Sequence, residues 1–297
     1  MELRVLQYFL AVAREQSISK AAESLHLSQP TLSRQIRDME EELGKQLLIR
    51  GNRKITLTEE GRILRKRAEE IINLVQKTEK EITFTDDTVR GDVYIGTGET
   101  EGVRLLARVA KELQKVYPQI HYHIVSGDSM DIMEHLDKGL FDFAILLDPA
   151  DVSKYEAIKL PYKDITGVLM RKDSPLAKKE RIHTYELAAL PLIVSRQQLK
   201  NGILDFLTSQ SGTPLNIVAS YNLIFNASLM VDEGLGYAIG LDKIINTTGN
   251  TNLTFRPITP PVEIGMHFVW KKYQVFSKPA EIFLQKMLTS LENNLNI

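Results

Sequence analysis

The chain has 297 residues, of which 43% are hydrophobic and 25% are charged, a composition typical of a globular protein with two or three domains. It contains no cysteine, which excludes disulfides, thiolate metal sites and thiol redox sensing, and no apolar stretch approaches the roughly 18 residues of a membrane span. The formal net charge of −1 does not by itself indicate a nucleic-acid partner. Because the N-terminus lacks the basic start and the apolar run of a secretory signal, we expect a cytoplasmic protein.

The N-terminal part of the chain predicts a series of short amphipathic helices. Ser19 is placed to cap the second helix, which carries Ala21, Ala22 and Leu25. A third helix should begin at Ser28. The face of the first helix that we expect to be buried consists of Leu3, Leu6, Phe9, Leu10 and Ala13.

The third helix has the clearest apolar stripe. Ser28 suits its N-cap, Pro30 suits its first turn, and Gly44 suits its C-terminal cap. Its apolar residues recur at spacings of 4, 3 and 4, which places them on one face. The stripe consists of Leu32, Ile36, Met39 and Leu43.

A basic hairpin is predicted next. Residues 46–58 alternate loosely around Gly51 and Asn52, a hairpin turn signal, with Arg53 beside the tip. From residue 43 to 68 the chain has eight basic and two acidic residues, a local charge of +6 that would attract a phosphate backbone. On charge alone, a solvated charged face is the alternative interpretation.

A long helix is predicted from Thr58 to about Thr85, on the order of 40 Å in length. Apolar residues recur along it at alternating spacings of 4 and 3, a heptad pattern. Such a seam needs a partner, so we expect a dimer; the alternative is a helix packed on its own domain. The predicted interface residues are Leu64, Ala68, Ile71, Val75 and Ile82, and the seam also includes Leu57, Gly61 and Thr78.

A polar break from Thr85 to Gly91 precedes a region in which strands and helices alternate, which predicts mostly parallel sheets covered on both faces. We therefore divide the chain into a head (1–58), a linker and dimerisation helix (59–88) and an α/β domain (89–297). The predicted strands are 92–96, 120–125, 141–147, 165–170, 192–194, 215–219, 237–239 and 264–270, and the predicted helices are 102–116, 130–136, 199–209, 224–233 and 279–295.

The outward face of the third helix has side chains suited to DNA. Arginine can bond guanine, glutamine can bond adenine and threonine can contact thymine in the major groove, whereas further basic residues position a protein on phosphates. Each residue alone would be an ordinary surface side chain. Together with the neighbouring short helix and basic hairpin, they predict a winged helix-turn-helix. The candidate DNA contacts are Gln29, Pro30, Thr31, Ser33, Arg34, Arg37 and Arg53.

Residues 9–61 closely resemble the DNA-binding domain of the LysR-type transcriptional regulators. One departure is Leu48, where the family commonly has phenylalanine before the wing, a conservative exchange in the core. The rest of the chain fits the family's layout with less specific motifs. The matching motifs are Ala21-Ala22, LHLSQPTLSRQI from Leu25 to Ile36, EEELG ending at Gly44 and LTEEG from Leu57 to Gly61.

The resemblance implies a cytoplasmic homo-oligomer, usually a dimer of dimers, that binds an interrupted dyad in double-stranded promoter DNA. It also implies a small co-inducer that changes the protein's shape, with RNA polymerase as a further possible partner and no membrane. Carried over residue by residue, the recognition-helix contacts fall on five of the candidates above, and the wing contact falls on Arg53. Those five are Gln29, Pro30, Thr31, Ser33 and Arg34.

The C-terminal part resembles the family's two-lobed effector domain, which is similar to periplasmic binding proteins. We expect lobe one to comprise 91–161 and 268–297, lobe two to comprise 162–267, and hinges near Pro161 and His267. Ligands of such folds lie between the lobes, at the ends of strands and the starts of helices. The candidate effector contacts are Thr100, Ser129, Leu147, Ser195, Asn222 and Phe225.

Two neighbouring acidic residues, Glu99 and Asp128, make the mouth of this predicted site more acidic than a carboxylate ligand would require, so a zwitterionic or a neutral effector stays open. The competing function classes are an enzyme or a solute receptor built on the same two lobes, and an architectural DNA-binding protein. No phosphate loop, nucleophile motif or metal-ligand spacing of histidines supports an enzyme, a metal or a cofactor. A receptor would need an export signal, and an architectural protein would not need the α/β domain.

Overall fold

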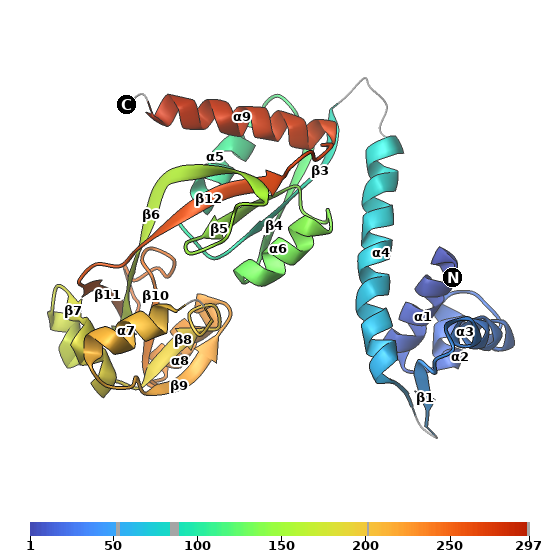
Figure 1. Ribbon diagram of the computed structural model, residues 1–297, viewed down its shortest axis with the longest axis horizontal. Coiled ribbons are helices and arrows are strands. Elements are labelled where there is room, and N and C mark those ends of the chain that lie inside the picture. The colour runs from blue at the N-terminus through green and yellow to red at the C-terminus, as the bar shows by residue number, and fades with distance from the viewer. Residues whose placement is uncertain (52–53, 84–88, 201, 296–297) are drawn as a thin grey trace. The chain divides into compact units, whose positions relative to one another are not determined.

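The computed structural model of the chain describes residues 1–51, 54–83, 89–200 and 202–295 (Figure 1). The chain divides into two compact units, Met1–Thr85 and Asp86–Ile297. The long helix belongs with the head in the first unit and is not a separate body. In the part of the chain described, no helix is both long enough and apolar enough to cross a membrane.

The first unit is a bundle of short helices with a hairpin and one long helix. Its core lies between the short helices, the first hairpin strand and the start of the long helix, where Phe9, Leu32, Ile36 and Leu48 are fully buried. The elements are α1 (Leu3–Glu15), α2 (Ile18–Ser24), α3 (Gln29–Leu43), β1 (Leu48–Arg50), β2 (Ile55–Leu57) and α4 (Glu59–Thr83).

The ends of α3 are where the sequence predicts them. The Ser28 hydroxyl accepts a hydrogen bond from the Thr31 N–H (3.3 Å), Pro30 lies in the first turn, and Gly44 ends the helix with a φ of 62°. The cap predicted for α2 is wrong: Ser17, and not Ser19, accepts the bond from the Lys20 N–H. Ile18 between them is buried and already helical, so the helix begins before Ser19.

Two residues expected in the buried stripes are exposed. Leu3 is 36% exposed and Leu43 is 41% exposed, whereas the central residues of both helices are buried. Both lie in a terminal turn, where helical periodicity continues but less of the chain covers the face. The stripes therefore predict the middle of each helix correctly and its ends incorrectly.

The hairpin and the start of α4 are fixed against α3. β1 and β2 are antiparallel, with Leu48 opposite Leu57. The Thr58 hydroxyl accepts the Gly61 N–H (3.0 Å) and donates to the Gln46 carbonyl (2.8 Å), which caps α4 as predicted. A Cβ on Gly61 would lie 2.2 Å from the Leu47 carbonyl oxygen, so this close approach requires glycine.

The predicted seam of α4 separates into two parts. Ala68 is fully buried in the core of the first unit and Leu64 packs against that core. This part of the helix therefore packs on its own domain, which is the alternative to a dimer seam. Ile71 and Ile82, by contrast, are 39% and 77% exposed. A helix of 3.6 residues per turn drifts relative to a heptad pattern, so one seam can face two different surfaces along its length.

The second unit is an α/β domain with two lobes, and its first lobe is covered on both faces. Buried side chains alternate along β5, with Phe143 packing toward α5 and α9 and Ala144 toward α6. Lobe one contains β3 (Arg90–Thr97), α5 (Val103–Gln114), β4 (Gln119–Ser126), α6 (Ser129–Asp137), β5 (Phe143–Leu147), the first part of β6 (Tyr155–Arg171), β12 (Glu263–Lys271) and α9 (Lys278–Leu295).

Lobe two repeats this arrangement with α7 and α8 on opposite faces of its sheet. The sequence did not predict β7 or β11, nor the first part of β6. Lobe two contains the second part of β6, η1 (Pro175–Lys178), β7 (Ile182–His183), η2 (Thr184–Ala189), β8 (Leu192–Ser195), α7 (Ile203–Ser211), β9 (Ile217–Tyr221), α8 (Ile224–Asp232), β10 (Tyr237–Leu241) and β11 (Leu253–Thr259).

The sheet is mixed, whereas the sequence predicts mostly parallel pairing. Its main strand order is β4-β3-β5-β12-β6-β10-β8-β9, and β11 pairs with β6 and β7 beside this path. The parallel pairs are formed by β3, β4 and β5 in lobe one, and by β8, β9 and β10 and by β7 with β11 in lobe two. β6 and β12, which join the lobes, are antiparallel to their neighbours. The carboxyl ends of the parallel strands of each lobe therefore face the join between the lobes (Figure 1).

Both crossings between the lobes differ from the predicted hinges. β6 pairs with β12 as far as Ile165 and with β10 from Thr166, so the first crossing comes after Pro161. β12 pairs within lobe one from Glu263, so the second crossing comes before His267. β6 passes between the lobes as one continuous strand, and a continuous strand gives no turn signal by which the sequence could mark the crossing.

Candidate functional site

The first candidate surface is the outward face of α3. Gln29, Thr31, Arg34 and Arg37 are exposed and Ser33 is half-buried, with the buried stripe on the other side. Pro30 is exposed beside them. Most of this surface is therefore open to a partner and comes from one helix.

The polar groups on this face have weak or local partners. Arg34 Nε lies 3.8 Å from Asp38 Oδ2, and the two side chains are 82% and 54% exposed, so this ion pair contributes little. The Thr31 hydroxyl shares a hydrogen bond of 2.7 Å with Ser28. The guanidinium of Arg34 can therefore exchange its carboxylate partner for another hydrogen-bond acceptor at low cost.

Glu40, which sequence reasoning missed, connects α3 to the hairpin. Its Oε1 atom accepts hydrogen bonds from the backbone N–H groups of Leu47 (2.7 Å) and Leu48 (3.0 Å). Its Oε2 atom lies 3.7 Å from Arg50 Nη2. The helix and the first wing strand are thereby held in one geometry. The predicted wing contact Arg53 lies outside the described residues.

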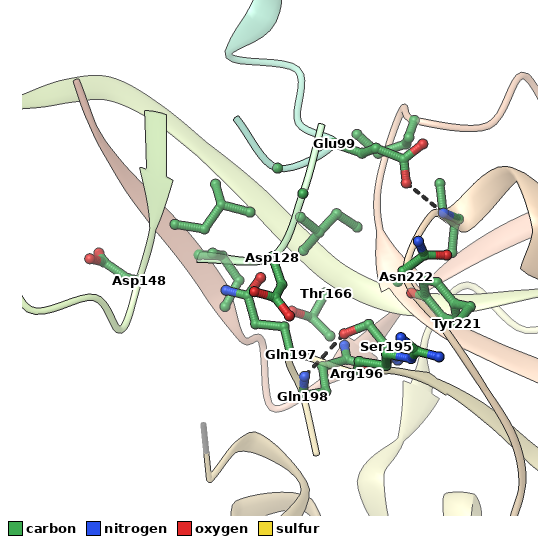
Figure 2. Close-up of a pocket in the computed structure, with 18 residues that line it drawn as sticks. Glu99, Asp128, Asp148, Thr166, Ser195, Arg196, Gln197, Gln198, Tyr221 and Asn222 are labelled. Carbon is green, nitrogen blue, oxygen red and sulfur yellow. Dashed lines mark hydrogen bonds between the residues drawn. The ribbon is translucent and has the colours of Figure 1, made fainter. Parts of the chain in front are cut away.

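The second candidate site is a pocket between the two lobes of the α/β unit (Figure 2). It encloses about 760 Å³, including space that is open to solvent. Its wall follows the carboxyl ends of strands in both lobes, the position expected for a ligand of such a fold. The polar residues on the wall are Glu99, Asp128, Asp148, Thr166, Ser195, Arg196, Gln197, Gln198, Tyr221 and Asn222.

Three of the six predicted effector residues line this pocket, namely Leu147, Ser195 and Asn222. Ser129 does not line it, but its hydroxyl accepts a hydrogen bond of 2.9 Å from Gln197 Nε2, which joins lobe one to lobe two at the pocket's edge. Phe225 is also outside the wall and is 62% exposed. It follows the buried first residue of α8, so its side chain projects from another face of that helix.

Thr100 has a structural contact in place of the predicted ligand contact. It is buried, its hydroxyl donates to Asp164 Oδ2, and it accepts the Gly102 N–H (3.1 Å). Asp164 lies on β6 beside the crossing and is itself buried. Burial and the nearby Asp242 raise the pKa of Asp164, while the Thr100 bond favours its ionised form. Thr100 therefore stabilises the join between the lobes.

Glu99 bridges the two lobes. It follows β3 in lobe one, and its Oε2 atom accepts a hydrogen bond of 2.5 Å from the backbone N–H of Ile224, the first residue of α8 in lobe two (Figure 2). The N-cap residue of α8 is Leu223, whose side chain cannot cap a helix. Glu99 thus supplies the missing cap from the other lobe. Burial raises the pKa of Glu99, although the Ile224 bond acts in the opposite direction.

Gln198 and Tyr221, which the sequence did not single out, also line the pocket and are held by local bonds. The Ser195 hydroxyl accepts the Gln198 N–H (3.1 Å), and the Gln198 side chain accepts the Ser195 N–H (2.9 Å). Tyr221 donates its hydroxyl to the Ile239 carbonyl (2.7 Å), and its burial raises the pKa of its phenol. The reciprocal Ser-x-x-Gln pattern was a usable capping signal for the turn after β8.

Comparison with known protein families identifies both units. A family model described as "Bacterial regulatory helix-turn-helix protein, lysR family" matches residues 3–62, and the model "LysR substrate binding domain" matches residues 86–292. The chain belongs to the LysR family. Its DNA-binding head and its substrate-binding domain are the two parts of that family's transcription regulators.

Individual relatives agree with this assignment. The chain is 33% identical over 196 residues to the "Hydrogen peroxide-inducible genes activator" of Pectobacterium carotovorum subsp. carotovorum, a match covering 65% of this chain and 64% of that protein, less than two thirds of its length. It is 29% identical over 295 residues to the "Uncharacterized HTH-type transcriptional regulator YybE" of Bacillus subtilis (strain 168), covering 97% and 99% of the two chains.

Solved structures show the same fold over the whole LysR-family chain. The crystal structure of CbnR, a LysR family transcriptional regulator, matches with a TM-score of 0.78 at 18% identity and covers 98% of this chain and 99% of its own. HinK from Pseudomonas aeruginosa matches with a TM-score of 0.57 at 23% identity and covers 98% of each chain.

Proposed function

We propose that this LysR-family protein is a sequence-specific transcription regulator, that α3 reads its DNA site and that a small molecule between the two lobes controls it. The observation that carries the proposal is the presence, in one chain, of an exposed polar recognition face and a pocket between two lobes. CbnR, which shares the fold, has been crystallised with its target DNA, and this supports a DNA partner at the level of the fold.

The base contacts would come from the start of α3. The Arg34 side chain is more exposed than that of its ion-pair partner Asp38, and its guanidinium offers two parallel donors suited to guanine. Gln29 and Thr31 are exposed beside it. Pro30 and Ser33 complete this surface, and Arg37 is placed for a phosphate. Arg53 stays a prediction from the resemblance, because the wing tip lies outside the described residues.

A second copy of the chain would cover the exposed apolar residues of α4. Ile63, Ile71, Leu74 and Ile82 are all at least 39% exposed, and they share one side of the helix, next to the buried Ala68. Val75 is half-buried at the border between this side and Ala68. A dimer, or a dimer of dimers, would present two heads to a two-fold DNA site. RNA polymerase would be a further partner of the regulator, and its location would be the cytoplasm.

The effector would contact Leu147 from lobe one and Ser195 and Asn222 from lobe two, with Ser129 at the edge. Its chemistry differs from that suggested by the peroxide-inducible relative: this chain has no cysteine, so a thiol cannot react with peroxide here. A binding function without catalysis agrees with the regulator names of the relatives. No cofactor is part of the proposal.

Selection of binding sites from a random DNA pool tests the function directly. We expect the full-length protein to enrich one motif with two-fold symmetry and to bind it at least about 1,000-fold more tightly than random DNA at the same salt concentration. Equal affinity for the selected and random pools would overturn the proposal.

A further inference from the structure

The helix starts that face the pocket already hold carboxylates of the protein itself. Asp128, on the pocket wall, caps α6 by accepting the Asp131 N–H (3.0 Å). Glu99 caps α8 from the other lobe through the Ile224 N–H. Free N–H groups at helix starts are the usual binding site for an anionic group of a ligand. Here carboxylates of the protein already accept hydrogen bonds from N–H groups at the starts of both helices. An anionic effector would have to compete with these side chains.

The two capping carboxylates differ in the positive charge beside them. Three carboxylates line the pocket, and Arg196 is the only cationic lining residue among those described. Asp128 has an ion-pair partner in Lys200, whose Nζ lies 3.9 Å from its Oδ2. Figure 2 shows the carboxylate of Asp148 pointing away from the other labelled side chains, and it lies 3.3 Å from His267 Nδ1. Glu99 and Asp128 therefore dominate the inner charge of the pocket.

Glu99 is the carboxylate that most lacks a counter-ion. Its one hydrogen bond comes from a neutral backbone N–H, and it is half-buried, which raises its pKa. A carboxylate desolvated in this way is stabilised when a cation is brought next to it. A ligand that enters the pocket can supply that cation, and it would gain an interaction that is strengthened by the partial exclusion of water.

We propose that the effector carries an ammonium group, which binds at Glu99, with Asp128 adding to the negative charge of the pocket, while Ser195 and Asn222 of lobe two bind the rest of the molecule. The inference rests on the proposed function, because it assumes that this pocket holds the effector. Both acidic residues belong to lobe one and Asn222 to lobe two, so one amine-bearing molecule would contact both lobes. Arg196, at the exposed edge of the pocket, could bind a carboxylate in a zwitterion but is not needed for a simple amine.

Three probes of equal chain length separate the ligand classes: 1,4-diaminobutane, 4-aminobutanoate and butanedioate. We expect isothermal titration at pH 7.5 to show binding of at least one amine to the full-length protein, and no binding of butanedioate. Glu99→Gln and Asp128→Asn should each weaken amine binding at least tenfold. Both substitutions keep the hydrogen-bond acceptor, and asparagine is also a good N-cap, so the fold is retained. Glu101→Gln, on a carboxylate outside the pocket wall, is the matched control and should bind as the wild type does.

Each other result overturns the inference in a distinct way. Binding of butanedioate with loss in Asn222→Val would place an anionic effector in the pocket, which contradicts the ammonium proposal and leaves the proposed function intact. Amine binding that Glu99→Gln and Glu101→Gln reduce equally would be unspecific charge attraction. Absence of binding by both amines at millimolar concentration would also overturn it. Failure of the proposed function would show separately, as the absence of an enriched motif in the DNA selection.

Discussion

The two functional surfaces of this protein are built in opposite ways. The face proposed to read DNA comes from one helix, and its side chains are mostly exposed and weakly paired. The pocket is assembled from the ends of many strands in two lobes. Hydrogen bonds join the lobes there, from the Ile224 backbone N–H to Glu99 and from the Gln197 side chain to Ser129 at the edge. The first surface belongs to a single helix, so it can meet a DNA groove without any rearrangement of the protein. The second depends on how the lobes are placed, which suits a sensor.

This difference predicts where substitutions act. A change on the outer face of α3 should alter DNA binding and leave the protein's stability nearly unchanged, because the removed atoms contact little of the protein. A change in the pocket can alter stability, lobe position and ligand affinity together.

Ile71→Asp should abolish the dimer and with it tight binding to a two-fold site, a loss of more than about 100-fold. Ile71 is 39% exposed on the apolar side of α4, and a charge there would be buried without a partner in a dimer. Sedimentation and a DNA titration measure the two effects. Asn73→Asp adds the same charge at an exposed position of the same helix and is the control. An intact Ile71→Asp dimer would place the subunit interface elsewhere.

Arg34→Ala should weaken binding to the selected DNA by about 1–3 kcal/mol, roughly 5- to 150-fold, with a smaller loss on random DNA. Its melting temperature should match the wild type, because its ion pair with Asp38 is exposed. Fluorescence anisotropy with both DNAs checks this, and Arg14→Ala on α1 controls for the loss of a surface charge. Equal losses on both DNAs would make Arg34 a phosphate contact.

Thr100→Val should destabilise the protein by about 1–3 kcal/mol, because buried Asp164 loses its hydroxyl donor. The affinity for effector should change much less, since Thr100 does not line the pocket. Denaturant unfolding measures the stability, and Thr100→Ser, which keeps the hydroxyl, should restore most of it. If Thr100→Val has the stability of the wild type but no longer responds to effector, Thr100 contacts the ligand as the sequence predicted.

The smallest effect concerns the pH dependence of stability. Burial raises the pKa of Glu99 above its ordinary value of 4.5, so the folded protein binds this proton more tightly than the unfolded chain does. The contribution of Glu99 to stability is therefore present below pH 4.5 and is lost as pH rises through the raised pKa. Glu99→Gln should gain melting temperature relative to the wild type between pH 4.5 and 7. A difference that does not vary with pH would mean that the fold does not perturb this carboxyl.

The same contrast explains what the sequence could predict. The caps Ser28 and Gly44 and the buried stripe of α3 are signals within one helix, and the structure confirms them. Leu147, Ser195 and Asn222 could be found because they lie at or just after the carboxyl ends of predicted strands. Thr100 follows a strand as well, but its partner Asp164 lies 64 residues further along the chain, so no local pattern shows that its hydroxyl is already bonded.

Long-range pairing also accounts for the incorrect hinges. The position at which β6 passes from β12 to β10 depends on which strands lie beside it, and those strands come from the end of the sequence. Glu99 could be seen to make the site acidic, but its role as the cap of α8 depends on a contact between residues 125 positions apart. The hydrogen bonds that join the pocket's residues therefore could not be predicted from the sequence and are seen only in the structure.

The central claim is that a molecule between the lobes controls how the head binds DNA. The most direct test takes a compound that raises the melting temperature of the wild type and titrates it against the complex with selected DNA, for the wild type and for Asn222→Val. We predict that the variant binds DNA normally without the compound and needs roughly 5- to 150-fold more of it to change DNA binding, because one hydrogen bond to the bound compound is lost. Asn226→Val, which changes an exposed asparagine of α8 outside the pocket wall, should respond as the wild type does. A wild-type response in Asn222→Val, or DNA binding that the compound never alters, would contradict the claim.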